Sequence, residues 1–158
     1  MTRRWFGAPL FTSLIVALLL LSACGGDSDD AGSTDGGDGT ATGTGGLQLS
    51  STDLGDLLVD GGGNTLYLFL PDDQGASTCY NDCEAAWPVV GELSTVGEGL
   101  DAALLGTTER NNGDLQATYN GWPLHYFSAD AGPGETRGQG ANNVWYVVDA
   151  DGNPVGAG

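Results

Sequence analysis

The residues best suited to chemistry in this 158-residue chain are two closely spaced cysteines, Cys79 and Cys83, and the single histidine, His125. Two residues four positions apart on a helical turn have Cα atoms about 6 Å apart, which a disulfide can span. In an exported protein a disulfide is the simplest expectation. Two other interpretations stay open: the thiolates could hold a soft cation such as Cu(I), with His125 as a third ligand, or form an exchangeable redox pair.

The rest of the chain offers little support for catalysis. His125 is the only imidazole that could activate a nucleophile, and no nucleophile elbow, zinc-protease motif or phosphate loop accompanies it. A single histidine on a strand is usually packed. The sequence therefore predicts no catalytic residue and, unless the cysteines bind copper, no cofactor.

Charge narrows the range of partners. The chain has 21 acidic residues against four arginines and no lysine, for a formal net charge of −17. This balance excludes nucleic-acid binding, because almost nothing could neutralise the phosphates. It leaves a cation or a component of the cell envelope as candidate ligands, and it identifies no protein partner.

The first 23 residues have the order of an export signal. A basic start, Arg3 and Arg4, precedes the apolar run 10–21, which is short for a membrane span. The run ends in Leu-Ser-Ala followed by Cys24, which resembles the bacterial lipobox, where the cysteine is acylated and the signal is cut before it. We therefore predict a signal peptide over 1–23, lipidation of Cys24, and attachment to the outer face of the plasma membrane or in the periplasm.

A tether and one domain follow the lipidated cysteine. Residues 25–46 are only Gly, Ala, Ser, Thr and Asp, which cannot build a core, so 24–46 is predicted to be a disordered linker. The folded domain is predicted to occupy 47–158.

This domain repeats itself. Leu66 and Leu124 are 58 positions apart, and the same offset, with no gap, pairs Gly55 with Gly113. It also pairs Trp87 with Trp145. We therefore expect one repeat over about 49–91 and a second over about 107–149.

The elements expected within each repeat are short strands separated by turns. Alternating and continuous apolar runs predict strands over 66–70, 124–128 and 144–148, and short helical turns are expected over 79–86 and 100–105. The predicted fold class is a small, mainly β, antiparallel domain. Its two tandem pseudo-symmetric repeats would form two three-stranded units around one shared core.

The combined motifs resemble a family of secreted lipoprotein repeats whose function is unknown. The hallmark of that family is a tyrosine and an aspartate separated by four residues, which are Tyr67 and Asp72 here. The second copy keeps Asp130 but has His125 in place of the tyrosine. The first copy carries the fuller pattern, Leu66-Tyr67-Leu68-Phe69-x-x-Asp72 followed by Ser77-x-Cys79-x3-Cys83-x3-Trp87-Pro88.

The resemblance implies tandem repeats and a location outside the cytoplasm, and it implies no activity. For the hallmark pair, the simpler interpretation is a buried Tyr67 and an Asp72 that heads a turn by bonding amides two residues on. The alternative is that the pair binds a cation or ligand. We predict a lipid-anchored structural or binding module; the alternative is a copper-binding or redox accessory protein that uses Cys79 and Cys83.

Overall fold

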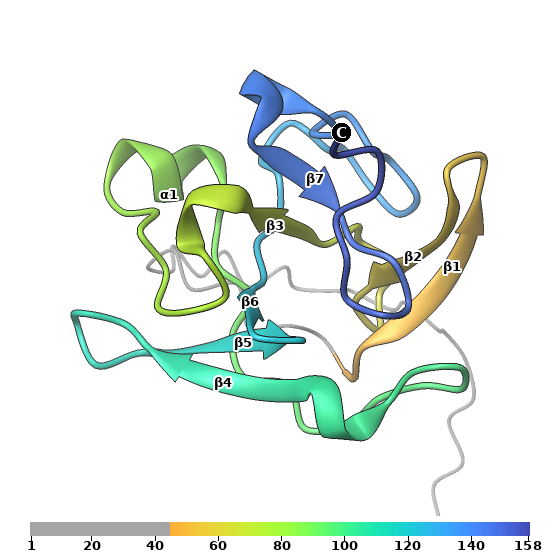
Figure 1. Cartoon of the computed structure of the whole chain (residues 1–158), viewed down its shortest axis with the longest axis horizontal. Coiled ribbons are helices and arrows are strands. Elements are labelled where there is room, and N and C mark those ends of the chain that lie inside the picture. Colours follow the sequence, from red (N-terminus) through yellow and green to blue (C-terminus); the bar gives the residue numbers. More distant parts are fainter. Residues whose placement is uncertain (1–44) are drawn as a thin grey trace, which may run out of the picture. The chain divides into compact units, whose positions relative to one another are not determined.

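The structure is a computed structural model that describes residues 45–158 (Figure 1). The predicted signal peptide, the lipidated Cys24 and nearly all of the predicted linker lie outside the described residues. Within residues 45–158, no helix has the length and apolar character needed to cross a bilayer.

Short antiparallel sheets make up the domain, which confirms the mainly β fold class. Strand β1 (Gln48–Thr52) pairs with β2 (Gly55–Val59) in a hairpin. Strand β3 (Tyr67–Phe69) pairs with β7 (Trp145–Val147). The third sheet has the order β4-β5-β6, with bounds Leu105–Glu109, Leu115–Tyr119 and Trp122–Pro123.

Within the described part of the chain, residues 45–158, helical structure is limited to four short pieces. Helix α1 spans Asp82–Ala86, and three 3-10 turns occupy Leu70–Asp72, Ala102–Leu104 and Ala141–Asn143. Both helical turns expected from the sequence are present, in shortened form. The strand predicted over 124–128 is wrong as a regular strand: only isolated bridges form there, from His125 to Tyr67 on one side and to Val89 on the other.

The two repeats exchange segments instead of forming two separate three-stranded units. Strand β3 of the first repeat pairs with β7 of the second (Figure 1). The exchange is mutual. Leu70 N of the first repeat donates to Val144 O of the second, and the equivalent Ser128 N of the second repeat donates to Ala86 O of the first. Each repeat therefore completes the other, and the predicted arrangement of strands is wrong in this respect.

A pseudo-two-fold axis passes between the two repeats at Tyr67 and His125. The backbone N–H of each donates to the carbonyl of the other, at 2.9 Å in both directions. These two residues are 58 positions apart, so they are equivalent members of the two repeats and are also direct neighbours across the axis.

The constant offset of 58 predicted from the sequence is wrong around β2 of the first repeat and β5 of the second. Leu58 N donates to Val148 O, and the equivalent bond in the other half runs from Ala117 N to Val90 O, both at 2.9 Å. The acceptors are 58 positions apart but the donors are 59 apart. The chain from Leu49 to its partner Leu58 is one residue shorter than the chain from Thr107 to its partner Ala117. The chain from Val59 to Thr65 is one residue longer than the chain from Thr118 to Pro123, so the offset returns to 58.

Two hydrophobic clusters replace the single core that the sequence suggested. The larger is mostly aliphatic and lies among β2, β3 and β5; Leu58, Leu66, Ala117 and Leu124 are among its members. The smaller is aromatic and contains Tyr67, Trp87 and Trp145 together with the disulfide cysteine Cys79. The predicted chemistry-bearing residues lie in or beside this aromatic cluster.

Candidate functional site

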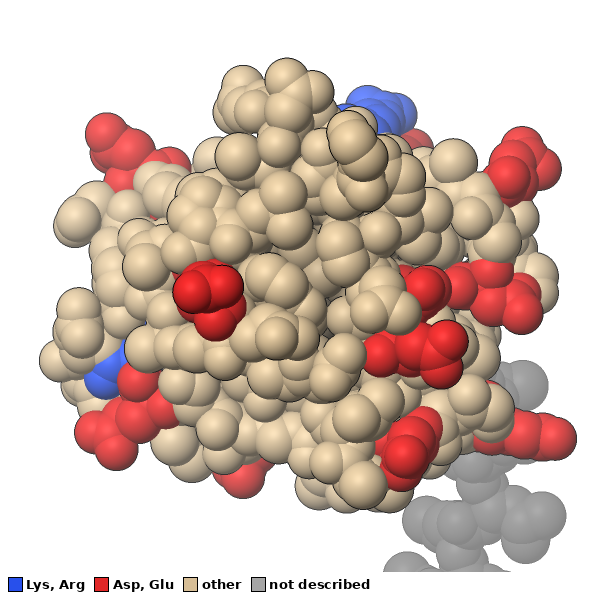
Figure 2. Space-filling view, in the orientation of Figure 1, with Lys and Arg blue, Asp and Glu red and all other residues tan. Residues whose placement is uncertain are grey.

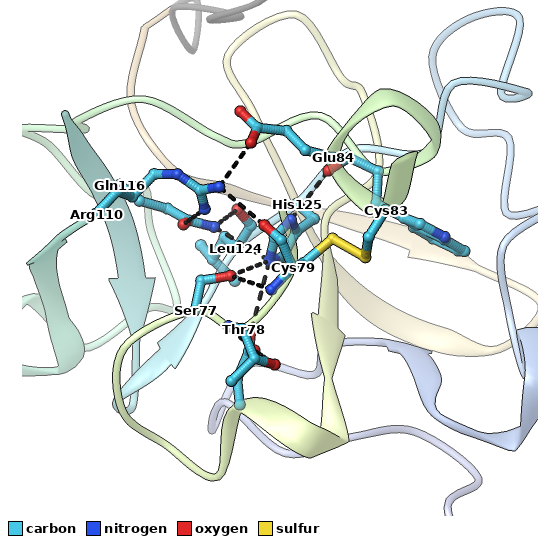
Figure 3. The surroundings of a disulfide bond; sticks show 11 residues. Ser77, Thr78, Cys79, Cys83, Glu84, Arg110, Gln116, Leu124 and His125 are labelled. Carbon is cyan, nitrogen blue, oxygen red and sulfur yellow. Dashed lines mark hydrogen bonds and ion pairs between the residues drawn. A yellow bond between two sulfur atoms is a disulfide. The ribbon is translucent and has the colours of Figure 1, made fainter. Parts of the chain in front are cut away.

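Cys79 and Cys83 form a disulfide, which confirms the simplest interpretation of their spacing (Figure 3). Their Cα atoms are 5.3 Å apart. Cys79 lies before α1 and is fully buried, whereas Cys83 lies in α1 and is partly buried. Asn81, which has a positive φ of 57°, redirects the chain between them.

His125 is fully buried, and both of its ring nitrogens face groups of the domain itself. Nδ1 lies 3.1 Å from the carbonyl oxygen of Trp87. A carbonyl can only accept, so Nδ1 carries a proton. Nε2 lies 3.2 Å from Nε2 of Gln116.

The orientation of the Gln116 amide fixes the role of that second nitrogen. Its Oε1 accepts from Nη1 of Arg110 at 2.6 Å, and its Nε2 donates to the carbonyl of Leu124 at 2.9 Å. Reversing the amide would place donor against donor and acceptor against acceptor. The amide NH₂ therefore points at His125, and His125 Nε2 is the acceptor of a neutral imidazole.

Ser77, His125 and Asp72 lie together but not in the geometry of a hydrolytic triad. Ser77 Oγ and Asp72 Oδ2 are each 3.5 Å from Nε2 of His125 (Figure 3 shows the serine and the histidine). A triad needs the carboxylate on the nitrogen opposite the nucleophile. Here both groups face the same nitrogen, and no part of the imidazole is exposed.

Asp72 anchors a turn, as the sequence suggested, but over a longer reach. Its Oδ1 accepts from the backbone N and the hydroxyl of Thr78, at 2.6 and 2.8 Å. The expected bond to an amide two residues on is wrong, because Asp73 and Gln74 take positive φ angles and turn the chain back toward Thr78. Asp72 Oδ2 is buried and accepts no hydrogen bond.

The hallmark tyrosine bonds the aspartate of the other repeat. Tyr67 donates its phenolic hydrogen to Asp130 Oδ2 at 2.7 Å and accepts from the N–H of Gly138 at 3.3 Å. Burial, followed by the hydrogen bond and charge of Asp130, raises the pKa of Tyr67 far above its usual value. A Cβ at Gly138 would lie 2.7–2.9 Å from Trp87 and Tyr67, so only glycine allows this close approach.

Sequence reasoning assigned no role to Arg110, which the structure places at the centre of the buried polar network. It is 3% exposed, and its Nη2 donates to the carbonyl of Cys79 and to Glu84 Oε2, both at 2.8 Å (Figure 3). The guanidinium also lies 4.3 Å from the centre of the Tyr80 ring. The available signal was its rarity: only two arginines lie beyond the predicted signal peptide.

In this structure the three residues predicted as alternative copper ligands have no free donor atom that faces a common point. Both sulfurs are bonded to each other, and the imidazole is occupied as described above. Among residues 45–158 no group of three His, Cys, Asp or Glu side chains could hold a metal ion.

The fold and its buried network define a small β protein of two interlocked repeats, stabilised by a disulfide. The chain belongs to the family described as a secreted repeat of unknown function, which matches residues 48–91 and 106–149. Its members are exported, so the protein is located outside the cytoplasm. No curated protein and no solved structure matches the chain.

Proposed function

We propose that this protein is a lipoprotein attached through acyl chains on Cys24 to the outer face of the plasma membrane or in the periplasm. Its two-repeat domain acts there as a structural or binding module and not as an enzyme. The secreted family, the lipobox-like sequence and the disulfide support the location.

The observation that carries the non-catalytic role is the use made of the polar side chains. Tyr67 bonds Asp130 of the opposite repeat, and His125 bonds the Trp87 carbonyl of the opposite repeat, so both side chains serve to hold the two repeats together. The imidazole is inaccessible to a substrate. Figure 2 shows acidic groups spread over the displayed face without gathering into one patch, which fits a soluble, self-repelling surface.

The anchor is tested by metabolic labelling with a palmitate analogue and by fractionation of cells that express the full chain. We expect label and a processed, membrane-associated chain in the wild type and in Ser28→Ala, a matched change in the tether. Cys24→Ser should carry no label and should keep the mass of the uncut signal. An unlabelled wild type, or label retained in Cys24→Ser, would contradict lipid anchoring at this residue.

The absence of catalysis is tested separately on the purified full chain with panels of ester, amide and phosphoester substrates. We expect no turnover above a buffer blank. Turnover that co-purifies with the protein and is lost in His125→Ala, with the fold intact by circular dichroism, would contradict the proposal.

The alternative, copper binding by Cys79 and Cys83, applies only to the reduced chain. Partial exposure of Cys83 gives a reductant access to the bond. Cu(I) titrated into the reduced chain would then bind at one ion per domain, and Cys83→Ser would abolish binding. Weak binding of Cu(I), equal in the reduced and the disulfide-bonded chain, would exclude this site.

A further inference from the structure

Four aromatic rings form a continuous stack across the pseudo-two-fold axis, in the order Phe69, Trp145, Trp87 and Phe127. The ring centres are 4.2, 3.9 and 4.2 Å apart in that order, and the interplanar angles are 18°, 5° and 25°. The two indoles at the middle are 2% and 6% exposed, and the two outer rings are partly buried. The stack therefore runs from one partly exposed ring, through two buried indoles, to another partly exposed ring.

The two indoles at the centre of the stack lie closer together than most aromatic pairs. Aromatic pairs prefer offset or edge-to-face contacts with centres about 4.5–7 Å apart, because the faces of two neutral rings repel each other. Trp87 and Trp145 lie nearly parallel with centres 3.9 Å apart. A ring that has lost one electron reverses this preference, since the positive charge is shared between two overlapping π systems.

Few other side chains of this protein compete for oxidation. The only methionine is Met1, and two of the three cysteines are joined in the disulfide. Tryptophan and tyrosine are therefore the most readily oxidised residues in the domain. Trp122, the other tryptophan there, packs at the edge of the aliphatic cluster, away from the stack.

Tyr67 supplies the stack with a second electron donor, and Asp130 lies in place to accept its proton. Its ring meets Trp87 edge-on with centres 5.4 Å apart, and its hydroxyl donates to Asp130 at 2.7 Å. The equivalent contact in the other half is His125 against Trp145, at 5.1 Å, and imidazole is not an electron donor of this kind. An electron can therefore reach the indole pair from the Tyr67 side and not from the His125 side.

We propose that this domain is a one-electron donor to strong oxidants, such as oxygen-centred radicals or high-potential metal complexes, in which Trp87 and Trp145 share the electron hole. The oxidant gains one electron, and the indole pair loses it. Tyr67 then passes one electron to the indole pair, and its phenolic proton moves to Asp130 Oδ2. The products are the reduced oxidant, a neutral tyrosyl radical and a protonated carboxyl group. This activity goes beyond the structural or binding role.

The test is laser flash oxidation of the purified full chain by a ruthenium(III) tris-bipyridine complex, followed by transient absorption. In the wild type we expect a near-infrared charge-resonance band, which two stacked indoles produce when they share a hole, and then a tyrosyl radical. Trp145→Phe keeps a ring in the stack but should lose the band. Trp122→Phe, the matched control, should retain it.

Two further variants test the proton-coupled step. Tyr67→Phe should keep the band, lengthen its lifetime and lose the tyrosyl signal, and Asp130→Asn should lose the tyrosyl signal because an amide is a poor proton acceptor. A wild-type protein with native circular dichroism that shows only the spectrum of an isolated indole radical would overturn the proposal. Loss of the signal in Trp122→Phe instead of Trp145→Phe would also overturn it.

Discussion

The two halves of the domain place different side chains opposite equivalent aspartates: Tyr67 faces Asp130 in one half, and His125 faces Asp72 in the other. In one, Tyr67 donates a short hydrogen bond to Asp130. In the other, His125 faces Asp72 at 3.5 Å, and the imidazole is held by Gln116 and by the carbonyl of Trp87. The aspartate and the exchanged backbone are common to both halves, so they are what the fold requires, and the residue facing the aspartate is what can change.

The change to histidine coincides with a larger polar network. Arg110 links Gln116 to Glu84 and to the carbonyl of Cys79, so the disulfide loop and the His125 half are joined through one guanidinium. The Tyr67 half has no counterpart: at the offset of 58, Arg137 and Ala141 replace the two cysteines, and the Arg137 side chain is 60% exposed. The His125 half therefore depends on a network that includes a guanidinium, and the Tyr67 half on the two hydrogen bonds of the Tyr67 hydroxyl.

The largest expected effect comes from removing the guanidinium. Arg110→Ala leaves a buried amide oxygen and a carbonyl without a donor, and it leaves Glu84 unpaired, so we expect a loss of about 3–4 kcal/mol in the free energy of unfolding. Urea unfolding followed by tryptophan fluorescence measures it. The matched control is Arg137→Ala, which breaks an exposed pair with Glu135 and should cost about 0–1 kcal/mol. Equal losses would show that the two halves do not differ in this way.

The disulfide should contribute less than the guanidinium. Cys83→Ser opens a loop of about five residues, for which the chain-entropy estimate is about 2 kcal/mol. The measurement is urea unfolding of the full chain, with the reduced wild type as a second form lacking the bond. A loss well above that of Arg110→Ala would mean that the bond, and not Arg110, holds the His125 half together.

Alkaline pH should destabilise the domain in part through the ionisation of Tyr67. Its pKa is raised in the folded state, so this group contributes stability fully below the pKa of an unfolded tyrosine and loses it as the pH rises above that value. Above pH of about 10, each such tyrosine should lower the free energy of unfolding by about 1.4 kcal/mol per pH unit. Burial also raises the pKa of Tyr126, which bonds Asp60, and the pKa of Tyr119, so the wild type should show the sum of three contributions.

Tyr67→Phe isolates the contribution of this half. The variant should be less stable than the wild type at neutral pH, and its stability should fall less steeply in alkali. Parallel curves for the two proteins would show that Tyr67 ionises as readily in the folded chain as in the unfolded one, contrary to the buried bond to Asp130.

The sequence predicted those features that depend on local pattern. The β fold class, the tandem repeats, the helical turns near Cys83 and Leu104, and the disulfide all follow from spacing and composition. The exchange of segments was missed because both repeats carry similar strands, and periodicity cannot tell which copy a strand pairs with. Arg110 was missed because a lone charged residue at a hairpin end predicts exposure, and its acceptors come from distant parts of the chain.

The smallest effect is spectroscopic, and it tests which ring nitrogen of His125 carries the proton. If Gln116 donates to Nε2, the imidazole at neutral pH is the neutral form with its proton on Nδ1. Nitrogen-15 correlation spectra of the single histidine should then show one protonated and one unprotonated ring nitrogen, with Nδ1 protonated. Gln116→Glu offers the sharper comparison, because a carboxylate accepts where the amide donated, so the histidine should gain a proton on Nε2. A spectrum with both nitrogens protonated in the wild type would mean that Asp72, and not Gln116, sets the state of His125, and the two halves would then be more alike than their residues suggest.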